Sequence, residues 1–321
     1  MKKVGFRHGI GEWYGRSFIH LDPAERKRFA DVQILDKKDR PPIECPFRTI
    51  PGHQVICTKE GGVCSIRLYQ QEIEDGPASV PTGQRGNLVT TCPHRFQQKR
   101  AIFRWIGETL LGHPEPLAVR EIGFLEQDPI ENGEASGNSK AGDVGRIDSV
   151  LVHPTRDPMH WCALEIQAVY FSGASMSKEF KLLRSFKKRI LPFPAANRHP
   201  DFRSSGPKRL MPQLQIKVPS LRRWGKKMAV VVDRNFFDAL GKMDDIKEAS
   251  NSDIAWYVVK YHESDGQVVL KPDFVRFTTL ERAVEGLTGG SPVSQEVFEA
   301  RIKEKLVGAL SRPKANLSSD Q

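Results

Sequence analysis

Apolar positions recur along the second half of the chain at two spacings, and each spacing predicts a different element. Apolar side chains three or four positions apart are typical of a helix with one buried face, whereas short apolar runs indicate strands. Helices are predicted over residues 97–111, 177–190, 236–243 and 294–310, and strands over residues 117–125, 147–152, 162–171, 214–218, 228–232 and 254–261. Because strands alternate with helices, the expected fold class is α/β or α+β, with a mixed-sheet core.

The first 100 residues show a less regular pattern. Residues 36–63 and 74–87 are rich in proline, glycine and charged residues, which indicates loops around short strands. A helix is predicted over residues 22–29, because Asp22 is a favourable N-cap and Pro23 suits the first helical position. We therefore expect a loop-rich region here.

The length of the chain supports a division at this change of pattern. The chain has 321 residues, and at about 150 residues per domain two domains are expected. We expect residues 1–100 to form an N-terminal region and residues 101–321 to form the core. Within that core, residues 131–140 are rich in glycine, serine and asparagine, which predicts a flexible loop.

The balance of charge indicates a polyanionic binding partner. Lys plus Arg number 49 and Asp plus Glu number 39, which leaves a net charge of +10. Basic residues concentrate in three runs, at residues 181–189, 198–209 and 222–227. Such runs can follow a phosphate backbone, although a single run is more often only a solvated face.

Hydropathy and the number of cysteines indicate the cellular compartment in which the protein is expected. No segment is apolar enough to span a membrane, and the N-terminus lacks the apolar stretch of a secretory signal. We therefore expect a cytoplasmic protein with no membrane partner. Its five cysteines are an odd number, which favours reduced or metal-bound thiols over a disulfide framework.

Acidic residues interrupt two of the predicted apolar strands. Asp148 lies in one of them, and Glu165 and Gln167 share a face of the next, because side chains alternate along a strand. If these strands pair, Asp148 meets that face, and two carboxylates can bind a Mg²⁺ that brings a phosphate and a nucleophilic water together. The alternative is structural: Asp148 pairs with Arg146 or Arg120, and Glu165 lies at an exposed strand edge.

Four of the cysteines fall in the N-terminal region, at Cys45, Cys57, Cys64 and Cys92. Four thiolates satisfy a tetrahedral metal, and the glycines and prolines around them suit tight ligand-bearing loops. Thiolate ligation permits either iron or zinc. The alternative is four ordinary reduced cysteines, which is the common state of buried thiols.

Asp148, together with Glu165 and Gln167, resembles the signature of PD-(D/E)XK nucleases, with glutamine in place of the usual lysine. Combined with the four cysteines, this set is similar to NotI-type restriction endonucleases. The resemblance implies a restriction-endonuclease-like mixed sheet flanked by helices, with Asp148 and Glu165 as Mg²⁺ ligands. It implies that Gln167 positions the attacking water and that one further acid takes part, either Glu121 or Glu108. It also favours a four-cysteine site that holds Fe or Zn.

The resemblance implies a type II restriction endonuclease that cleaves double-stranded DNA at a specific palindromic site, and relatives of this kind favour GC-rich sites. A homodimer is expected, because two-fold symmetry lets one active site address each strand. A cognate DNA methyltransferase is the expected functional partner, since an unopposed nuclease would cut its host's DNA. The alternative is a non-catalytic DNA-binding protein with a structural metal, in which the acidic strands only support the fold.

Overall fold

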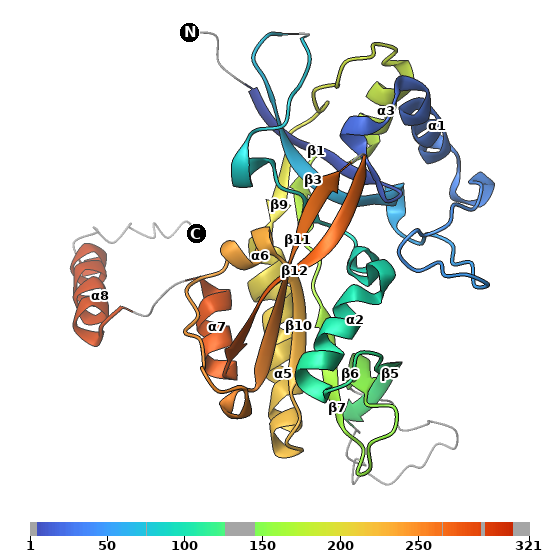
Figure 1. The fold of residues 1–321 in the computed structure, drawn as a ribbon. Coiled ribbons are helices and arrows are strands. Elements are labelled where there is room, and N and C mark those ends of the chain that lie inside the picture. Colours follow the sequence, from blue (N-terminus) through green and yellow to red (C-terminus); the bar gives the residue numbers. More distant parts are fainter. Residues whose placement is uncertain (1–4, 75, 126–144, 265, 290–292, 311–321) are drawn as a thin grey trace, which may run out of the picture.

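The computed structural model describes residues 5–74, 76–125, 145–264, 266–289 and 293–310 (Figure 1). Over these residues the strands form a four-stranded sheet near the N-terminus, a six-stranded sheet in the core and a two-stranded ribbon. The loop predicted at residues 131–140 lies outside the described residues. None of the described helices has both the length and the apolar character that crossing a lipid bilayer requires.

The six-stranded sheet is mixed and flanked by helices, which confirms the predicted α/β class. Its strand order is β12-β11-β10-β7-β6-β5. The central strands β7, β10 and β11 run parallel, and the outer strands are antiparallel to their neighbours. The six strands are β5 (Leu117–Leu125), β6 (Gly145–Val152), β7 (Trp161–Ile166), β10 (Met228–Asp233), β11 (Ile254–Ser264) and β12 (Gln267–Thr278).

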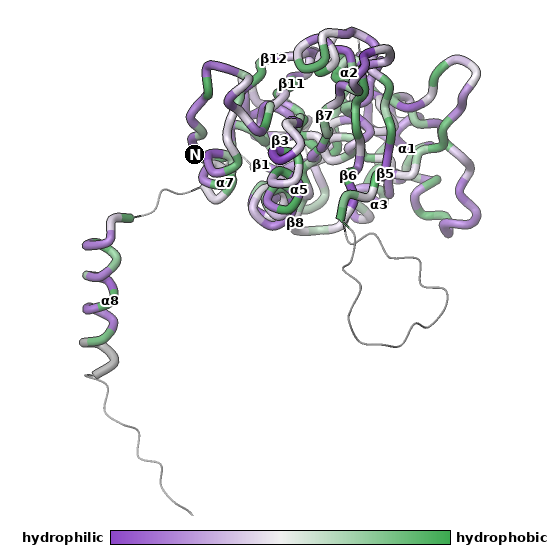
Figure 2. Tube along the Cα trace, turned by 90° about the horizontal axis from the view of Figure 1, so that it is seen from below, coloured by the Kyte–Doolittle hydropathy of each residue, from purple (hydrophilic) through white to green (hydrophobic). Residues whose placement is uncertain are grey.

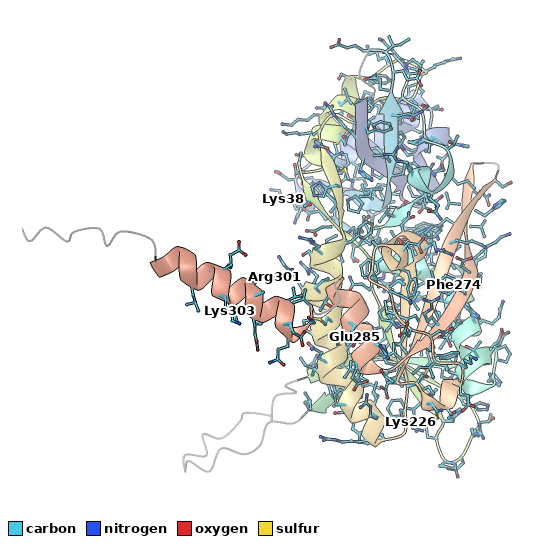
Figure 3. The ribbon with its side chains drawn as sticks, turned by 90° about the vertical axis from the view of Figure 1, so that its left-hand side faces the viewer. Lys38, Lys226, Phe274, Glu285, Arg301 and Lys303 are labelled. Atoms are coloured by element: carbon cyan, nitrogen blue, oxygen red, sulfur yellow. The ribbon has the colours of Figure 1, made fainter. Side chains whose placement is uncertain are left out.

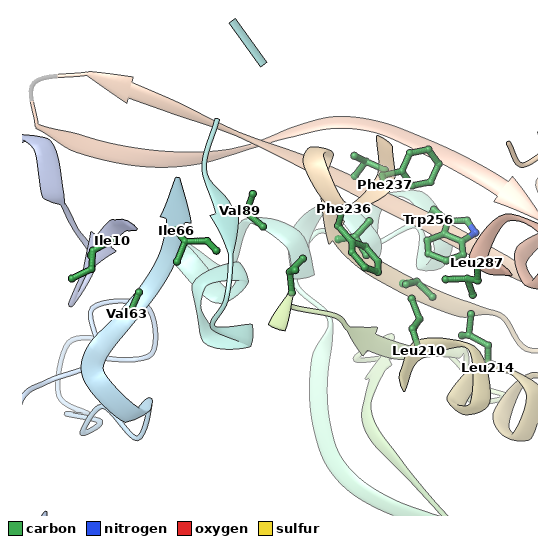
Figure 4. Close-up of a cluster of buried hydrophobic side chains, with 14 of the residues drawn as sticks. Ile10, Val63, Ile66, Val89, Leu210, Leu214, Phe236, Phe237, Trp256 and Leu287 are labelled. Carbon is green, nitrogen blue, oxygen red and sulfur yellow. The ribbon is translucent and has the colours of Figure 1, made fainter. Parts of the chain in front are cut away.

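Helices cover both faces of this sheet, and Figure 2 shows α2 and α5 on opposite sides of β7. α5 (Met211–Arg223) packs on one face, where its Leu214 joins Ala163 of β7 in a hydrophobic cluster that Figure 4 shows in part. α2 (Ala101–Ile106) packs on the other face, in a cluster that contains Leu164. Because side chains alternate along a strand, each central strand contributes to both clusters.

The N-terminal sheet has the strand order β2-β1-β3-β4, and helices from distant parts of the chain pack beside it. α1 (Pro23–Ile34) and α3 (Ser177–Ser185) contact each other, and Trp13 of β1 stacks on Phe180 of α3 with ring centroids 5.3 Å apart. The helix predicted at residues 22–29 is confirmed and extends to Ile34, with Asp22 as its N-cap. The strands of this part are β1 (Gly5–Trp13), β2 (Arg16–Ser17), β3 (Val63–Gln71) and β4 (Val89–Thr90), and those of the ribbon are β8 (Tyr170–Gly173) and β9 (Arg198–Asp201).

Buried ion pairs join the N-terminal sheet to the core. Arg95 Nε donates to the Glu12 carboxylate at 2.8 Å, with both side chains fully buried, and Arg95 also donates to the carbonyl oxygen of Val268 in β12. Arg67 of β3 pairs with Glu263 of β11 at 2.7 Å. Figure 1 shows the β11–β12 hairpin reaching up beside β1 and β3. Since one hydrophobic cluster spans both parts, the domain boundary near residue 100 stays a prediction.

One predicted strand is wrong, and another is divided in two. Residues 214–218 form part of helix α5: Leu214, Ile216 and Val218 alternate as in a strand, yet Ile216 is 55% exposed while the other two are buried. The buried positions are instead spaced as on one helical face. The run at residues 162–171 divides after Ile166, and its second part enters β8 in another sheet.

The other predicted helices are present with shifted ends. Residues 97–111 contain α2 and a π-helical turn, and α8 (Gln295–Leu310) stands apart from the rest of the chain in Figure 2. α3 and α6 (Arg234–Asp238) are shorter than predicted. Strand β12 and helix α7 (Leu280–Thr288) have no counterpart in the prediction. The short helix α4 (Phe202–Ser205) leads through a π-helical turn into α5.

Replacing Arg95 with Met is expected to lower the free energy of unfolding by about 3–5 kcal/mol, because it leaves the buried Glu12 carboxylate without its cation. Urea denaturation measures this loss. Lys27→Met is the matched control, since it removes a cation from an exposed pair with Asp31 and should cost at most ~1 kcal/mol. If both variants lost the same free energy of unfolding, the buried Glu12–Arg95 pair would contribute no more to stability than the exposed Lys27–Asp31 pair.

Candidate functional site

The first candidate site is a pair of carboxylates on neighbouring strands. β6 and β7 pair with Ser149 opposite Leu164 and Val150 opposite Ala163. The next step of this antiparallel register sets Asp148 opposite Glu165, so the two side chains point to the same face of the sheet. The Glu165 side chain is buried, whereas that of Asp148 is 67% exposed. One carboxylate is therefore anchored in the core and the other faces solvent.

Lys217 of α5 is the cation that makes a buried Glu165 tolerable. Its Nζ lies 2.8 Å from Glu165 Oε2 and 3.8 Å from Asp148 Oδ1, and the lysine side chain is itself only 3% exposed. Burial raises the pKa of Glu165; the ammonium group of Lys217 opposes this rise and the Asp148 carboxyl adds to it. The structural alternative placed Glu165 at an exposed strand edge, and this part of it is wrong, because Glu165 is buried in a strand that lies between β10 and β6.

Gln167 follows directly after β7. Its backbone N–H donates to the Val231 carbonyl oxygen at 3.0 Å, which continues the pairing of β7 with β10. The side chain is 9% exposed, and its Nε2 donates to the carbonyl oxygen of Ala168 at 2.5 Å. The structure thus places Gln167 two residues from Glu165, with its amide nitrogen turned to the backbone.

The two candidates for a further acid lie in different layers. Glu121 of β5 falls between the pairs Arg120–Ser149 and Ile122–Ile147, a register that sets it opposite Asp148. Its backbone has a φ of +54°, which is uncommon outside glycine, and its side chain is 76% exposed and 3.8 Å from Arg146. Glu108 lies in the π-helical turn after α2, in the layer that covers the other face of the sheet.

The four N-terminal cysteines come together from separate loops and strands. Cys45, Cys64 and Cys92 are each 3% exposed and form one cluster, with Cys57 partly buried against it. All five cysteines of the chain are free thiols. Backbone N–H groups contact the sulfur atoms, among them that of Lys59 at Cys57 and that of His94 at Cys92. Hydrogen bonds of this kind favour the charged form of a thiol, the form that binds metals.

Burial acts against this effect and raises the pKa of the Cys57, Cys64 and Cys92 thiols. In the part of the chain that the structure describes, no three His, Cys, Asp or Glu side chains are arranged so as to hold a metal ion. The cysteine cluster therefore has the donor chemistry of a thiolate site, and metal binding at the cluster stays a prediction.

The basic runs divide into structural and exposed residues. Arg198 is buried and pairs with Glu179 at 2.6 Å, and Arg222 pairs with Asp253. Lys226, labelled in Figure 3, lies 5.5 Å from the Trp161 ring. The exposed cations of these runs are Lys181, Arg184, Lys187, Lys188, Arg189, Arg203, Lys208, Arg209, Arg222 and Arg223. Two of them, Arg184 and Arg222, also pair with carboxylates.

A further basic surface was not predicted. A groove of about 500 Å³ lies between the cysteine-bearing loops, α2 and β5. Its charged lining consists of Arg48, Lys99, Arg100 and Arg120, with no carboxylate among the described residues that line it. Lys99 and Arg100 both have positive φ, +51° and +56°. These cations are scattered along the sequence, so only the fold brings them together.

A family model described as Restriction endonuclease NotI matches residues 32–269. The match covers well over half of the chain and includes the four clustered cysteines and both carboxylates of the candidate site. No curated protein matches the chain.

Proposed function

The chain belongs to the NotI restriction endonuclease family, and we propose that it is a type II enzyme that cleaves double-stranded DNA at a specific palindromic site by Mg²⁺-dependent phosphodiester hydrolysis. The observation that carries this proposal is the placement of Asp148 and Glu165 on one face of neighbouring strands. A mixed sheet flanked by helices, with these carboxylates on the neighbouring strands β6 and β7, agrees with a PD-(D/E)XK fold.

Asp148 and Glu165 would hold the metal ion. Mg²⁺ is commonly bound by one or two carboxylates and keeps several waters, so two protein ligands suffice. The exposure of Asp148 leaves the pair open to a polymer as large as DNA. When bound, the metal stabilises negative charge on the scissile phosphate and lowers the pKa of a coordinated water. Glu121, which the β5–β6 register sets opposite Asp148, is the better candidate than Glu108 for the further acid.

Gln167 would orient the attacking water, since a neutral amide can donate and accept hydrogen bonds but cannot take up a proton. The water oxygen attacks phosphorus in line, and the bond from phosphorus to the 3′ oxygen breaks. The water's proton passes to solvent and the 3′ oxygen gains one. The products are a 5′-phosphate and a 3′-hydroxyl.

The DNA backbone would contact the exposed cations. The groove lined by Arg48, Lys99, Arg100 and Arg120 concentrates positive charge, with no carboxylate among the lining residues that the structure describes, and this composition suits phosphate groups. A palindromic site implies a homodimer, because a two-fold axis relates both the strands and the protomers. A cognate DNA methyltransferase would protect the host's own sites. Five free thiols suit the reducing cytoplasm.

The cysteine cluster would hold one structural iron or zinc ion. Four cysteines in one cluster, none of them in a disulfide, offer the type of donor that such metals prefer. A four-thiolate site leaves no open position for a substrate, so this metal would stabilise the N-terminal loops and take no part in hydrolysis.

A second candidate function is a non-catalytic DNA-binding protein with a structural metal. The observation in its favour is that Lys217 already pairs with both carboxylates and balances one of their two negative charges without Mg²⁺. Incubating plasmid DNA with purified protein and Mg²⁺, and mapping any cut ends, separates the two candidates. Defined ends at a palindrome support the nuclease, whereas binding without cleavage supports the alternative.

Replacing Asp148 with Ala should abolish Mg²⁺-dependent cleavage, because one of the two metal ligands is lost while no core volume is. DNA affinity in Ca²⁺, measured by gel shift, should stay within about twofold, since affinity comes largely from phosphate contacts. Glu72→Ala, which removes an exposed carboxylate elsewhere, is the control and should cleave like the wild type. A fully active Asp148→Ala enzyme would exclude this metal site.

Gln167→Ala should lower kcat by about tenfold, the effect of one lost hydrogen bond to the water, and leave KM nearly unchanged. Single-turnover cleavage on a defined duplex measures the rate. If the variant and the wild type have equal kinetics, Gln167 has no catalytic role and only caps β7.

Freshly purified protein should contain close to one tightly held Fe or Zn per chain, measured by elemental analysis. Cys57→Ser should lower both the metal content and the melting temperature, because metal affinity appears as stability of the folded loops. Cys162→Ala is the matched control: this cysteine is buried in the core cluster of the other face of the sheet and should leave the metal content unchanged. Metal-free protein of full stability would show four ordinary reduced cysteines.

A further inference from the structure

Lys217 brings to the two carboxylates an ammonium group that the motif on the strands lacks. A lysine two residues after the glutamate is the usual form of the PD-(D/E)XK signature, and Gln167 stands there in this chain. The structure brings an ammonium group to the same carboxylates from α5, 52 residues further along the chain. Its Nζ lies within 4 Å of an oxygen atom of both Glu165 and Asp148.

Stability alone does not account for the buried Lys217–Glu165 pair. The buried neighbours of Lys217 on α5 are Leu214, Val218 and Leu221, so two apolar side chains in place of the pair would suit these surroundings. Burying an ammonium and a carboxylate together has a large desolvation cost, and apolar replacements of such pairs are often neutral or stabilising. A paired charge kept at an open carboxylate site therefore points to a role in the chemistry of that site.

We propose that Lys217 supplies the active-site ammonium group and acts from helix α5 in place of the lysine absent from the β7 motif. The inference rests on the proposed nuclease function and assigns a further residue to it. Lys217 acts through its charge and its N–H donors, and the proposal includes no proton transfer from it. With three N–H donors and no acceptor, it orients the Glu165 carboxylate and donates to a non-bridging oxygen of the scissile phosphate, where negative charge develops.

In this assignment Gln167 and Lys217 have different roles in hydrolysis. Gln167 carries no charge and is restricted to orienting the water. Lys217 carries the charge but is fixed on a helix whose apolar residues are packed in the core, so its Nζ is held at the carboxylate pair. An ammonium and a divalent cation prefer the same carboxylate oxygens, and they therefore compete for Asp148 and Glu165 when DNA is absent.

The test compares Lys217→Met and Lys217→Arg with the wild type. Lys217→Met should lower single-turnover cleavage at saturating Mg²⁺ by about 100-fold, the effect of one lost donor to a developing charge, with DNA affinity in Ca²⁺ within twofold. Independently of cleavage, titration calorimetry with Mn²⁺ on DNA-free protein should show tighter binding, by roughly tenfold, once the competing ammonium is removed. Lys217→Arg should keep the weaker Mn²⁺ affinity, because it keeps the charge.

Lys227→Met is the matched control, since it removes a part-buried lysine whose Nζ contacts the Ser252 carbonyl oxygen rather than the carboxylate pair. It should change neither cleavage nor Mn²⁺ affinity. Full cleavage by Lys217→Met at saturating Mg²⁺, or an unchanged Mn²⁺ affinity, would overturn the assignment. Wild-type protein that cuts no DNA would instead overturn the nuclease proposal, so the two failures are distinguishable.

A second variant covers the case in which Lys217→Met does not fold. The double variant Gln167→Lys/Lys217→Gln returns the ammonium to the β7 motif and keeps a polar side chain on α5. It should cleave at least tenfold faster than Gln167→Met/Lys217→Gln. Equal rates in these two folded proteins would show that an ammonium group at this site is not what catalysis needs.

Discussion

The arrangement of the core depends on one constraint, which is that the Glu165 carboxylate is buried inside a sheet and needs a cation. An ionised carboxylate without a partner is costly in an apolar interior, so a positive group that reaches this face stabilises the sheet in this register. Lys217 provides that group at 2.8 Å and fixes how α5 crosses β7. The same contact brings Asp148 into the site, because Asp148 is the cross-strand neighbour of Glu165.

The N-terminal part also contains a buried carboxylate that is paired with a cation. Arg95 and Glu12 are fully buried, and their pairing, together with the Arg95 bond to β12, joins the cysteine-bearing region to the core. Cys92 lies three residues before Arg95 and in the same short turn, since Arg95 N–H donates to the Cys92 carbonyl oxygen. The cysteine cluster is thereby held at a fixed position relative to the sheet. A metal bound there would add stability to a connection that the ion pair already orients.

Positive charge has two uses in this chain, and composition does not separate them. Arg198 and Arg222 are engaged by carboxylates and support the fold. By contrast, the groove of Arg48, Lys99, Arg100 and Arg120 has no carboxylate among its described lining residues and remains available to a phosphate backbone. The net charge of +10 therefore predicts a polyanionic partner correctly in kind, because DNA is the substrate of the family, but it does not identify the contacting surface.

The sequence by itself determined the class of the fold, the family and the presence of a strand at each of the two acidic residues, although it extended the second of these strands beyond Ile166. Local signals suffice for these, because an N-cap such as Asp22 and the alternation around Asp148 and Glu165 act over a few residues. Only the tertiary structure identified Lys217. The short run at residues 214–218 fits both a strand and a helix, and an isolated lysine carries no signal of its own. Its partner Glu165 is 52 residues away in the sequence. The strength of their ion pair depends on burial, and both side chains become buried only when the helix packs on the sheet.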